Sequence, residues 1–233
     1  MNSFRLSAFF ICLLYFSMPA NGQFGLRLKY NSNNFSDWEN ALEERFDTDG
    51  KLYSPGYEVG LDYWFKLKKR RIEFMPEISY ALATTKYNNA ALTETKFTSY
   101  NFNFHTQIYA LDLEADCDCP TFSKQGPSIN KGLFFHFTPG VSFFNTSTTF
   151  SPAIDPAFKN ANGVAFKAGI GMGMDIGVSD LLTITPIISY YFNMGMNWEN
   201  LALNGSDVSS NPRQLQFTLR LGFRPDYGRG RRR

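Results

Sequence analysis

Apolar and polar residues alternate along most of the chain. Between Val164 and Asp180 every second position from Val164 to Val178 is apolar, and the positions between hold mainly glycine, with Lys167 and Asp175 among them. In a helix, residues two positions apart point in different directions, so apolar residues at every second position would not form one face. The Gly-x-Gly-x-Gly spacing also lacks the pattern of a nucleotide-binding loop. The stretch therefore predicts a β-strand with one apolar face.

Seven further segments alternate in the same way. The eight predicted strands are Phe24–Tyr30, Tyr57–Leu67, Ile72–Leu82, Lys96–Leu113, Leu133–Phe144, Val164–Asp180, Leu182–Asn193 and Arg213–Phe223. In the fourth strand the apolar set moves from even to odd positions after Ile108, which predicts a bulge at that point. Eight alternating strands in a chain of one domain's length predict an all-β fold.

The connections between these strands alternate in length. Short links follow the second and sixth strands, and longer polar links occupy residues 31–56, 83–95, 145–163 and 194–212. Long loops on one side and short turns on the other are typical of outer-membrane barrels. One link departs from this rule, because Ala115–Gly132 is long where a short periplasmic turn is expected.

The two faces of the strands differ in a way that favours a membrane barrel over a soluble sandwich. The apolar faces carry almost no charge, and small residues recur on the opposite faces. The charged residues of those opposite faces are Arg27, Lys29, Glu58, Asp62, Lys66, Glu73, Glu77, Lys167, Asp175 and Arg220. Eight strands enclose a lumen that side chains just fill, and buried charges must be paired. The faces predict lipid outside and a salt-bridged lumen inside; a selective pore is the alternative.

The two ends of the chain set the predicted domain limits. Residues 1–22 are typical of a signal peptide: Arg5 precedes a short apolar core, and the small residues Ala20 and Gly22 mark a cleavage site before Gln23. Residues 23–224 are predicted to form the barrel and 225–233 a basic periplasmic tail. The net charge of +2 argues against a general nucleic-acid binder.

The last strand ends on Phe223, and an alternating final strand that closes on an aromatic residue is similar to the assembly signal of bacterial outer-membrane barrels. The mature chain resembles the small eight-stranded barrels of the OmpA/OmpX type. Its Asn-, Phe- and Tyr-rich composition and its Asp-Cys-Asp-Cys-Pro turn are similar to the Bacteroidota branch with its PorT-like barrels. The resemblance implies an eight-stranded antiparallel up-and-down transmembrane barrel with long extracellular loops, in contact with outer-membrane lipid. It also implies a structural role or an accessory role in an envelope complex for secretion or barrel assembly.

The long fourth link contains the most unusual stretch, Asp116-Cys117-Asp118-Cys119-Pro120. Two cysteines in an oxidising compartment usually form a disulfide, and a Cys-x-Cys bridge closes a small, strained ring. A local bridge, a bridge to a partner or redox role, and a metal site with the two aspartates are the three interpretations. The extra length makes this link, together with the extracellular loops, a candidate docking site for an envelope protein.

No catalytic triad is legible, since the only histidines are His105 and His136, both inside predicted strands. We expect a non-enzymatic protein without cofactor or bound metal; a barrel enzyme acting on lipid or peptide is a further alternative. The first long loop predicts a short helix with a capping box from Ser36 to Glu39. Its apolar residues Trp38 and Leu42 are expected to rest on the barrel rim, and a surface for a partner is the alternative.

A solvated periplasmic turn is expected to hold the basic residues Lys66, Lys68, Lys69, Arg70 and Arg71. Contact of these residues with lipid phosphates or with an acidic partner is the alternative.

Overall fold

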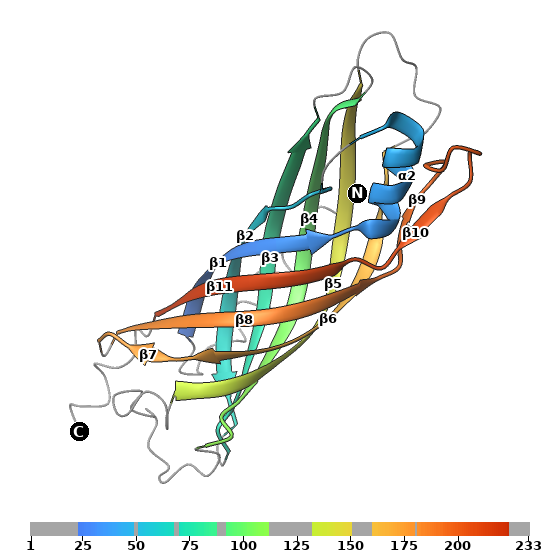
Figure 1. Cartoon of the computed structure of the whole chain (residues 1–233). Helices are drawn as coiled ribbons and strands as arrows, with labels where there is room; N and C mark the ends of the chain where they lie inside the picture. The colour runs from blue at the N-terminus through green and yellow to red at the C-terminus, as the bar shows by residue number, and fades with distance from the viewer. Residues whose placement is uncertain are drawn as a thin grey trace, which may run out of the picture.

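The computed structural model describes residues 23–48, 51–67, 70–87, 92–111, 132–150, 160–179 and 181–223. In these ranges the chain forms eleven strands and one helix: β1 (Gln23–Asn34), α2 (Ser36–Phe46), β2 (Gly56–Lys66), β3 (Ile72–Lys86), β4 (Leu92–Ile108), β5 (Leu133–Phe150), β6 (Asn162–Met174), β7 (Ile176–Gly177), β8 (Leu182–Met194), β9 (Met196–Trp198), β10 (Val208–Ser210) and β11 (Arg213–Phe223). Figure 1 shows the long strands wrapped around one axis.

Eight of the strands close an antiparallel barrel. The order runs from β1 through β2, β3, β4, β5, β6 and β8 to β11, and β11 pairs back with β1. In the closing pair Phe24 lies opposite Phe223 at one end and Asn34 lies opposite Arg213 at the other. The predicted eight-stranded up-and-down barrel is therefore confirmed.

The two ends of the barrel differ. Figure 1 shows α2, β9 and β10 gathered at one end and β7 at the other. Long loops face the outside in outer-membrane barrels, so we call the end that carries α2 the extracellular end and the opposite end the periplasmic end. Helix α2 is the only helix in the described ranges, and at 11 residues it is shorter than a membrane-spanning helix.

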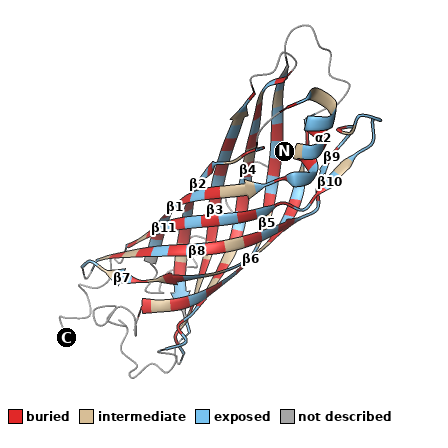
Figure 2. Cartoon of the chain, viewed as in Figure 1, coloured by how far each residue is buried: buried red, intermediate tan, exposed pale blue. Residues whose placement is uncertain are grey.

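The outer surface of the barrel is apolar. Buried and exposed residues alternate along the strands, as Figure 2 shows, and large apolar side chains occupy the outward positions. Tyrosines on neighbouring strands pack in pairs: Tyr30 with Tyr57, and Tyr80 with Tyr100. Such a surface would cost about 25 cal/mol per Å² in water, whereas a band of apolar residues with aromatic girdles matches a bilayer. This is an integral outer-membrane β-barrel, surrounded by lipid.

Several strands extend further toward the extracellular end than the alternation predicted. β1 continues to Asn34, β3 to Lys86 and β5 to Phe150, and β4 begins at Leu92. The added residues are mostly polar on the outward side. Backbone pairing does not require an apolar outer face once a strand has left the bilayer, so the hydrophobic pattern stops before the strand does.

The predicted bulge near Ile108 is wrong. β4 ends at Ile108, and the pairing between β4 and β5 changes register only between Leu92 and Glu94. The shift of the apolar set to Tyr109 marks the end of the strand, because Tyr109 is buried in the lumen rather than facing lipid. The sixth predicted strand also differs, since it is interrupted at Asp175 between β6 and β7.

Helix α2 forms in the first long loop as predicted, but without the capping box. Phe35 is the N-cap residue, and Ser36 is already helical. The Glu39 Oε1 atom accepts a hydrogen bond from the Leu52 backbone N–H at 2.7 Å instead of capping its own helix. A contact with the neighbouring loop segment thus replaces the local one, which spacing alone did not reveal.

The apolar side of α2 enters the barrel mouth rather than lying on its rim. Trp38 is fully buried and stacks on Phe35, with ring centroids 5.3 Å apart, and meets Trp198 edge to face at 5.2 Å. The inward residues Phe97 and Phe144 of the barrel wall belong to the same cluster. We call the apolar cluster formed by α2, the following loop, β9 and the inner wall the cap.

Polar contacts hold the cap in place. The Trp38 Nε1–H donates to the Val208 carbonyl oxygen at 3.0 Å. The Arg45 guanidinium donates to three successive backbone carbonyls of residues 200–202, at 2.8 to 3.1 Å. Burial raises the pKa of the Tyr53 hydroxyl well above its ordinary value. The extracellular end is therefore closed by an ordered structure.

Candidate functional site

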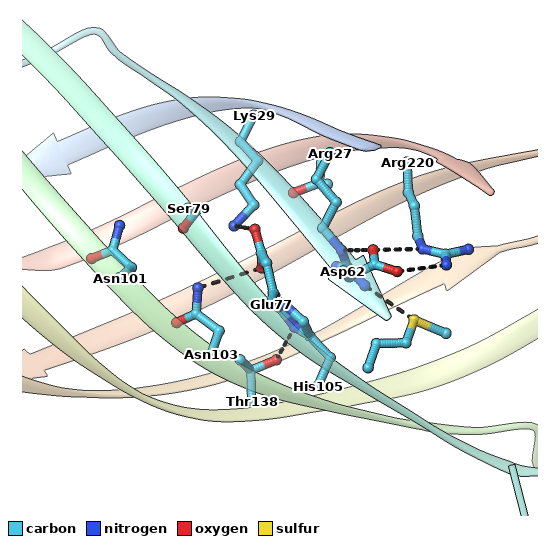
Figure 3. A network of polar contacts seen from close by, with 12 residues as sticks. Arg27, Lys29, Asp62, Glu77, Ser79, Asn101, Asn103, His105, Thr138 and Arg220 are labelled. Carbon is cyan, nitrogen blue, oxygen red and sulfur yellow. Dashed lines mark hydrogen bonds and ion pairs between the residues drawn. The ribbon is translucent and has the colours of Figure 1, made fainter. Parts of the chain in front are cut away.

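The lumen below the cap is filled with charged side chains. Asp62 lies between two of its arginines. Its Oδ2 accepts from Arg27 Nε at 2.6 Å and from Arg220 Nε at 2.8 Å, and its Oδ1 accepts from Arg220 Nη2 at 2.7 Å (Figure 3). All three side chains are buried. A single carboxylate thus joins two arginines from β1 and β11 and balances one of their two positive charges.

An acidic layer lies closer to the periplasmic end. Glu73 Oε2 accepts from Trp64 Nε1 at 2.6 Å and from the Tyr109 hydroxyl at 3.1 Å. The same hydroxyl lies 2.5 Å from Asp175 Oδ2. Two acids with Arg71 give this layer a formal charge of −1, which balances the +1 of the Asp62 layer above it.

Arg71 was expected in the solvated turn and is buried instead. Its guanidinium carbon lies 4.2 Å from the centroid of the Tyr109 ring, and its backbone carbonyl accepts from the Tyr109 N–H. Arg71 has the same parity as Glu73, Met75 and Glu77, which all point inward from β3. The sequence could therefore have predicted that Arg71 points inward. The row of inward residues begins before β3 does.

A third layer surrounds Lys29. The ammonium group contacts Glu58 Oε1 at 2.8 Å and Glu77 Oε1 at 2.6 Å. Neutral polar groups complete the coordination of both acids, as Figure 3 shows for Asn103 and Glu77. The side chains that donate to Glu58 are those of Asn31, Ser79, Asn101 and Gln216. The charges of this layer are therefore paired, as burial requires, whereas the Oδ1 atoms of Asn101 and Asn103 are buried without a hydrogen-bond partner.

Two histidines extend this layer across the lumen. His105 Nε2 contacts Glu77, and its Nδ1 lies 2.8 Å from His136 Nε2 and 2.9 Å from the Thr138 hydroxyl. His136 Nδ1 lies 3.3 Å from the Ser189 hydroxyl. The sequence placed both histidines in adjacent strands but did not reveal this hydrogen-bonded chain, which runs from β3 to β8.

Lys167 lines a small cavity between the charged layers and the cap. Its ammonium lies 5.1 Å from the centroid of the Tyr191 ring. The cavity measures about 30 Å³, and its walls include Glu58 and Asn101 on the polar side and Phe97 and Met196 on the cap side. This volume has room for one or two water molecules beside the Lys167 ammonium.

Inward glycines make room for the large side chains of neighbouring strands. A Cβ atom on Gly169 would overlap the Tyr191 ring, and one on Gly173 would lie 2.5 Å from Phe134. A Cβ on Gly60 would overlap Glu77 in the same way. The glycine repeat in β6 is thus the complement of aromatic residues on β5 and β8.

Replacing Gly169 with Ala should destabilise the barrel by about 1–3 kcal/mol, because the new methyl group forces the Tyr191 ring from its position. Urea unfolding in detergent micelles measures the loss. The double variant Gly169→Ala with Tyr191→Ser should recover part of it, since the smaller side chain frees the space. A single Gly169→Ala variant as stable as wild type would show that the Tyr191 ring does not need the space left by the missing side chain of Gly169.

The nine lumen charges named from the sequence, Arg27, Lys29, Glu58, Asp62, Glu73, Glu77, Lys167, Asp175 and Arg220, all face inward and are buried. The backbone of Lys66 in β2 pairs with that of Glu73 in β3, and the Lys66 side chain lies outside the described residues. Phe223 ends β11, pairs with Phe24 and faces outward. Asp116, Cys117, Asp118, Cys119 and Pro120, the signal peptide and the basic tail also lie outside the described residues.

One group of lumen side chains has the composition of a catalytic triad. His105 lies between Glu77 and Thr138 in the order of a carboxylate, a base and a nucleophile, but all three are buried. Catalysis requires a substrate within reach of the nucleophile and the base, and the cap and the charged layers close both approaches. Within the described ranges, no group of three or more His, Cys, Asp or Glu side chains is placed to hold a metal ion.

Comparison with known proteins gave structural likenesses only. No protein-family model matches the chain, and neither does any curated protein. Neisserial surface protein A is 10% identical, with 88% of this chain and 97% of that chain covered and a TM-score of 0.49. Ail, the attachment invasion locus protein of Yersinia pestis, is 10% identical over 87% and 96%, with a TM-score of 0.44. The N-terminal barrel domain of Pseudomonas aeruginosa OprF is 12% identical over 87% and 99%, with a TM-score of 0.38.

The fold of this chain follows from its own strand pairings, independently of these likenesses. Eight strands close, the outer belt is apolar, and five buried acids face five buried bases inside: Glu58, Asp62, Glu73, Glu77 and Asp175 against Arg27, Lys29, Arg71, Lys167 and Arg220. The described chain is an eight-stranded outer-membrane β-barrel with a charge-filled lumen and an apolar extracellular cap.

Proposed function

We propose that this protein is a closed, non-enzymatic barrel that serves as an accessory subunit of an outer-membrane complex. The observation that carries the proposal is the double closure of the lumen. Ion-paired layers fill the part of the barrel within the bilayer, and the cap fills the extracellular mouth. A barrel closed in this way acts through its surfaces rather than through its interior.

The filled lumen argues against the alternative of a small-solute pore. A conducting pathway needs a continuous row of water along the axis, whereas the cavity beside Lys167 holds about 30 Å³. Opening a path past Asp62 would separate it from two arginines and leave buried charges uncompensated, which costs several kcal/mol. An eight-stranded barrel rarely leaves a channel in any case.

The ordered cap supports a role in binding a partner. Arg45 and Trp38 fix α2 against the chain that connects β9 and β10. The face of α2 that points away from the barrel is polar and exposed, with Glu43 and Glu44 on it. A preorganised surface loses little conformational entropy when a partner binds. The long link between β4 and β5, with Cys117 and Cys119, is the second candidate contact, on the periplasmic side.

The purified barrel should give no steady conductance in a planar bilayer, because neither closure contains a continuous water path. A conducting porin inserted by the same protocol serves as the control for insertion, and heat-modifiability on a gel verifies that the sample is folded. Stable unitary currents from the wild-type protein would contradict a closed barrel.

Purification from outer membranes in mild detergent, followed by mass spectrometry, should yield a second envelope protein in stoichiometric amount. A barrel that always purifies alone would contradict the accessory role.

A further inference from the structure

Three prolines interrupt the backbone pairing of the barrel wall. Each coincides with a gap of two residue pairs against one neighbouring strand, although the register is the same on both sides of the gap. Opposite Pro139 on β5, Phe104 and His105 of β4 have no pairing partner in that strand. The second gap lies between Pro76 of β3 and the neighbouring strand β2. The third lies between Pro186 of β8 and the break that separates β6 from β7. A proline lacks the N–H that the ladder needs.

Side chains bridge two of the three gaps from the lumen. At the Pro186 gap the Thr185 hydroxyl donates to Asp175 Oδ1 at 2.5 Å. At the Pro139 gap the bridging pair is Thr138 and His105, at 2.9 Å. The inward residues of these two gaps therefore hold together strands whose backbones do not pair there. The bridge between β4 and β5 differs from the one at Pro186 because it contains His105, which continues the contact to His136.

The hydrogen bonds of the histidine pair fit one pattern of protons. Since a carboxylate only accepts, His105 Nε2 carries the proton that is donated to Glu77, and Nδ1 is an acceptor. His136 Nε2–H then donates to that Nδ1, and the Ser189 hydroxyl donates to His136 Nδ1. A proton added to His105 would set two N–H groups against each other across 2.8 Å. A first proton fits on His136 Nδ1 if the Ser189 hydroxyl turns from donor to acceptor. A second proton makes His105 Nδ1 a donor that faces the His136 Nε2–H, and the Thr138 hydroxyl oxygen, which both nitrogens contact, then has to accept from both.

The charges around the pair come from several strands. Glu77 on β3 contacts His105 directly, and Lys29 on β1 holds Glu77 from the other side. Arg27 on β1 with Asp62 on β2, and Glu58 on β2, are the next charged groups. Lys167 on β6, whose ammonium faces the Tyr191 ring of β8, lies with Glu58 at the small cavity toward the cap. Glu77 and Glu58 are already engaged by Lys29, so neither acid is free to balance a second histidinium.

We propose that His105 and His136 form an acid-sensitive latch, which holds β4 and β5 together where Pro139 interrupts their ladder and loosens when the pair takes up protons. A histidine in an unfolded chain binds a proton near pH 6.5. Each proton that the fold excludes lowers the folded-to-unfolded ratio about tenfold per pH unit below that value. The latch therefore weakens as pH falls, and this seam is affected before the rest of the wall.

The chain is well suited to a test, because these are its only two histidines. Carboxyl groups in unfolded chains titrate near pH 4, so the interval from pH 7.0 to 5.5 reports mainly on the pair. Urea unfolding of the full-length mature protein in micelles should show the folded-to-unfolded ratio falling roughly eightfold across this interval if one proton is excluded. Exclusion of both gives a fall of roughly seventyfold. A ratio that does not change would overturn the latch.

Two further measurements locate the effect. The variant with His105→Gln and His136→Gln should lose this pH dependence, and a variant that kept it would assign the effect to another group. Nitrogen-15 spectra of the wild-type histidine rings should show both rings protonated at Nε2 at pH 7.5, a readout that does not depend on any variant folding. Amide exchange at pH 5.5, corrected for intrinsic rate, should increase in β4 and β5 more than in β1 and β11. Equal change in all strands would rule out a local seam.

Discussion

Replacing Asp62 with Lys is expected to abolish the heat-resistant folded form of the barrel. The substitution removes the carboxylate that joins Arg27 and Arg220 and places a third cation between them. Breaking a buried ion pair by removing one partner costs about 3–5 kcal/mol, and the added positive charge increases the loss. Heat-modifiability on a gel and urea unfolding in micelles both measure the outcome.

A second variant separates charge from shape. Asp62→Leu together with Arg220→Met keeps the net charge of this layer at +1, because one acid and one base are removed together. Buried ion pairs can often be replaced by apolar residues at little cost, so this variant should be clearly more stable than Asp62→Lys. Glu44→Lys, on the exposed face of α2, is the matched control and should behave like wild type. An Asp62→Lys barrel that folds with wild-type stability would show that the lumen charges are not paired in solution.

Replacing Trp38 with Ala is expected to disorder the cap while leaving the barrel wall folded. Trp38 is fully buried between Phe35 and Trp198, and removing a buried tryptophan side chain costs about 3–5 kcal/mol. The hydrogen bond to the Val208 carbonyl is lost as well. Helix α2 takes no part in the ladder hydrogen bonds of the eight barrel strands, so the loss should be local. Limited proteolysis of the folded protein should cut within the first long loop.

The same variant tests whether the lumen has two independent closures. The charged layers around Asp62 and Lys29 do not involve α2. The Trp38→Ala variant should therefore give no conductance in a planar bilayer, and it should remain heat-modifiable on a gel. Asn40→Ala, on the exposed side of the same helix, is the control and should resist the protease as wild type does. If Trp38→Ala unfolded the whole barrel, the cap would be part of the barrel's cooperative unit. If it conducted, the charged layers would not close the lumen.

The alternation of residues was enough to predict the barrel and the direction of its side chains. A strand places successive residues on opposite faces, so parity alone identified Arg27 and Asp62 as inward and Tyr57 as outward. It would also have identified Arg71, had the inward row of β3 been followed one step before the strand. Strand ends were less accurate, because outside the bilayer a strand no longer needs an apolar face.

The contacts among inward residues were decided by tertiary structure. Asp62 and Arg220 are 158 positions apart and meet because barrel closure brings β11 beside β1 and sets the register of both. His105 and His136 meet for the same kind of reason, across β4 and β5. The sequence predicted the helix that contains Trp38, but only the position of Trp198 and the inner wall shows that its apolar face enters the mouth. Direction is a local property of a strand, whereas height in the lumen depends on the register of every strand around the ring.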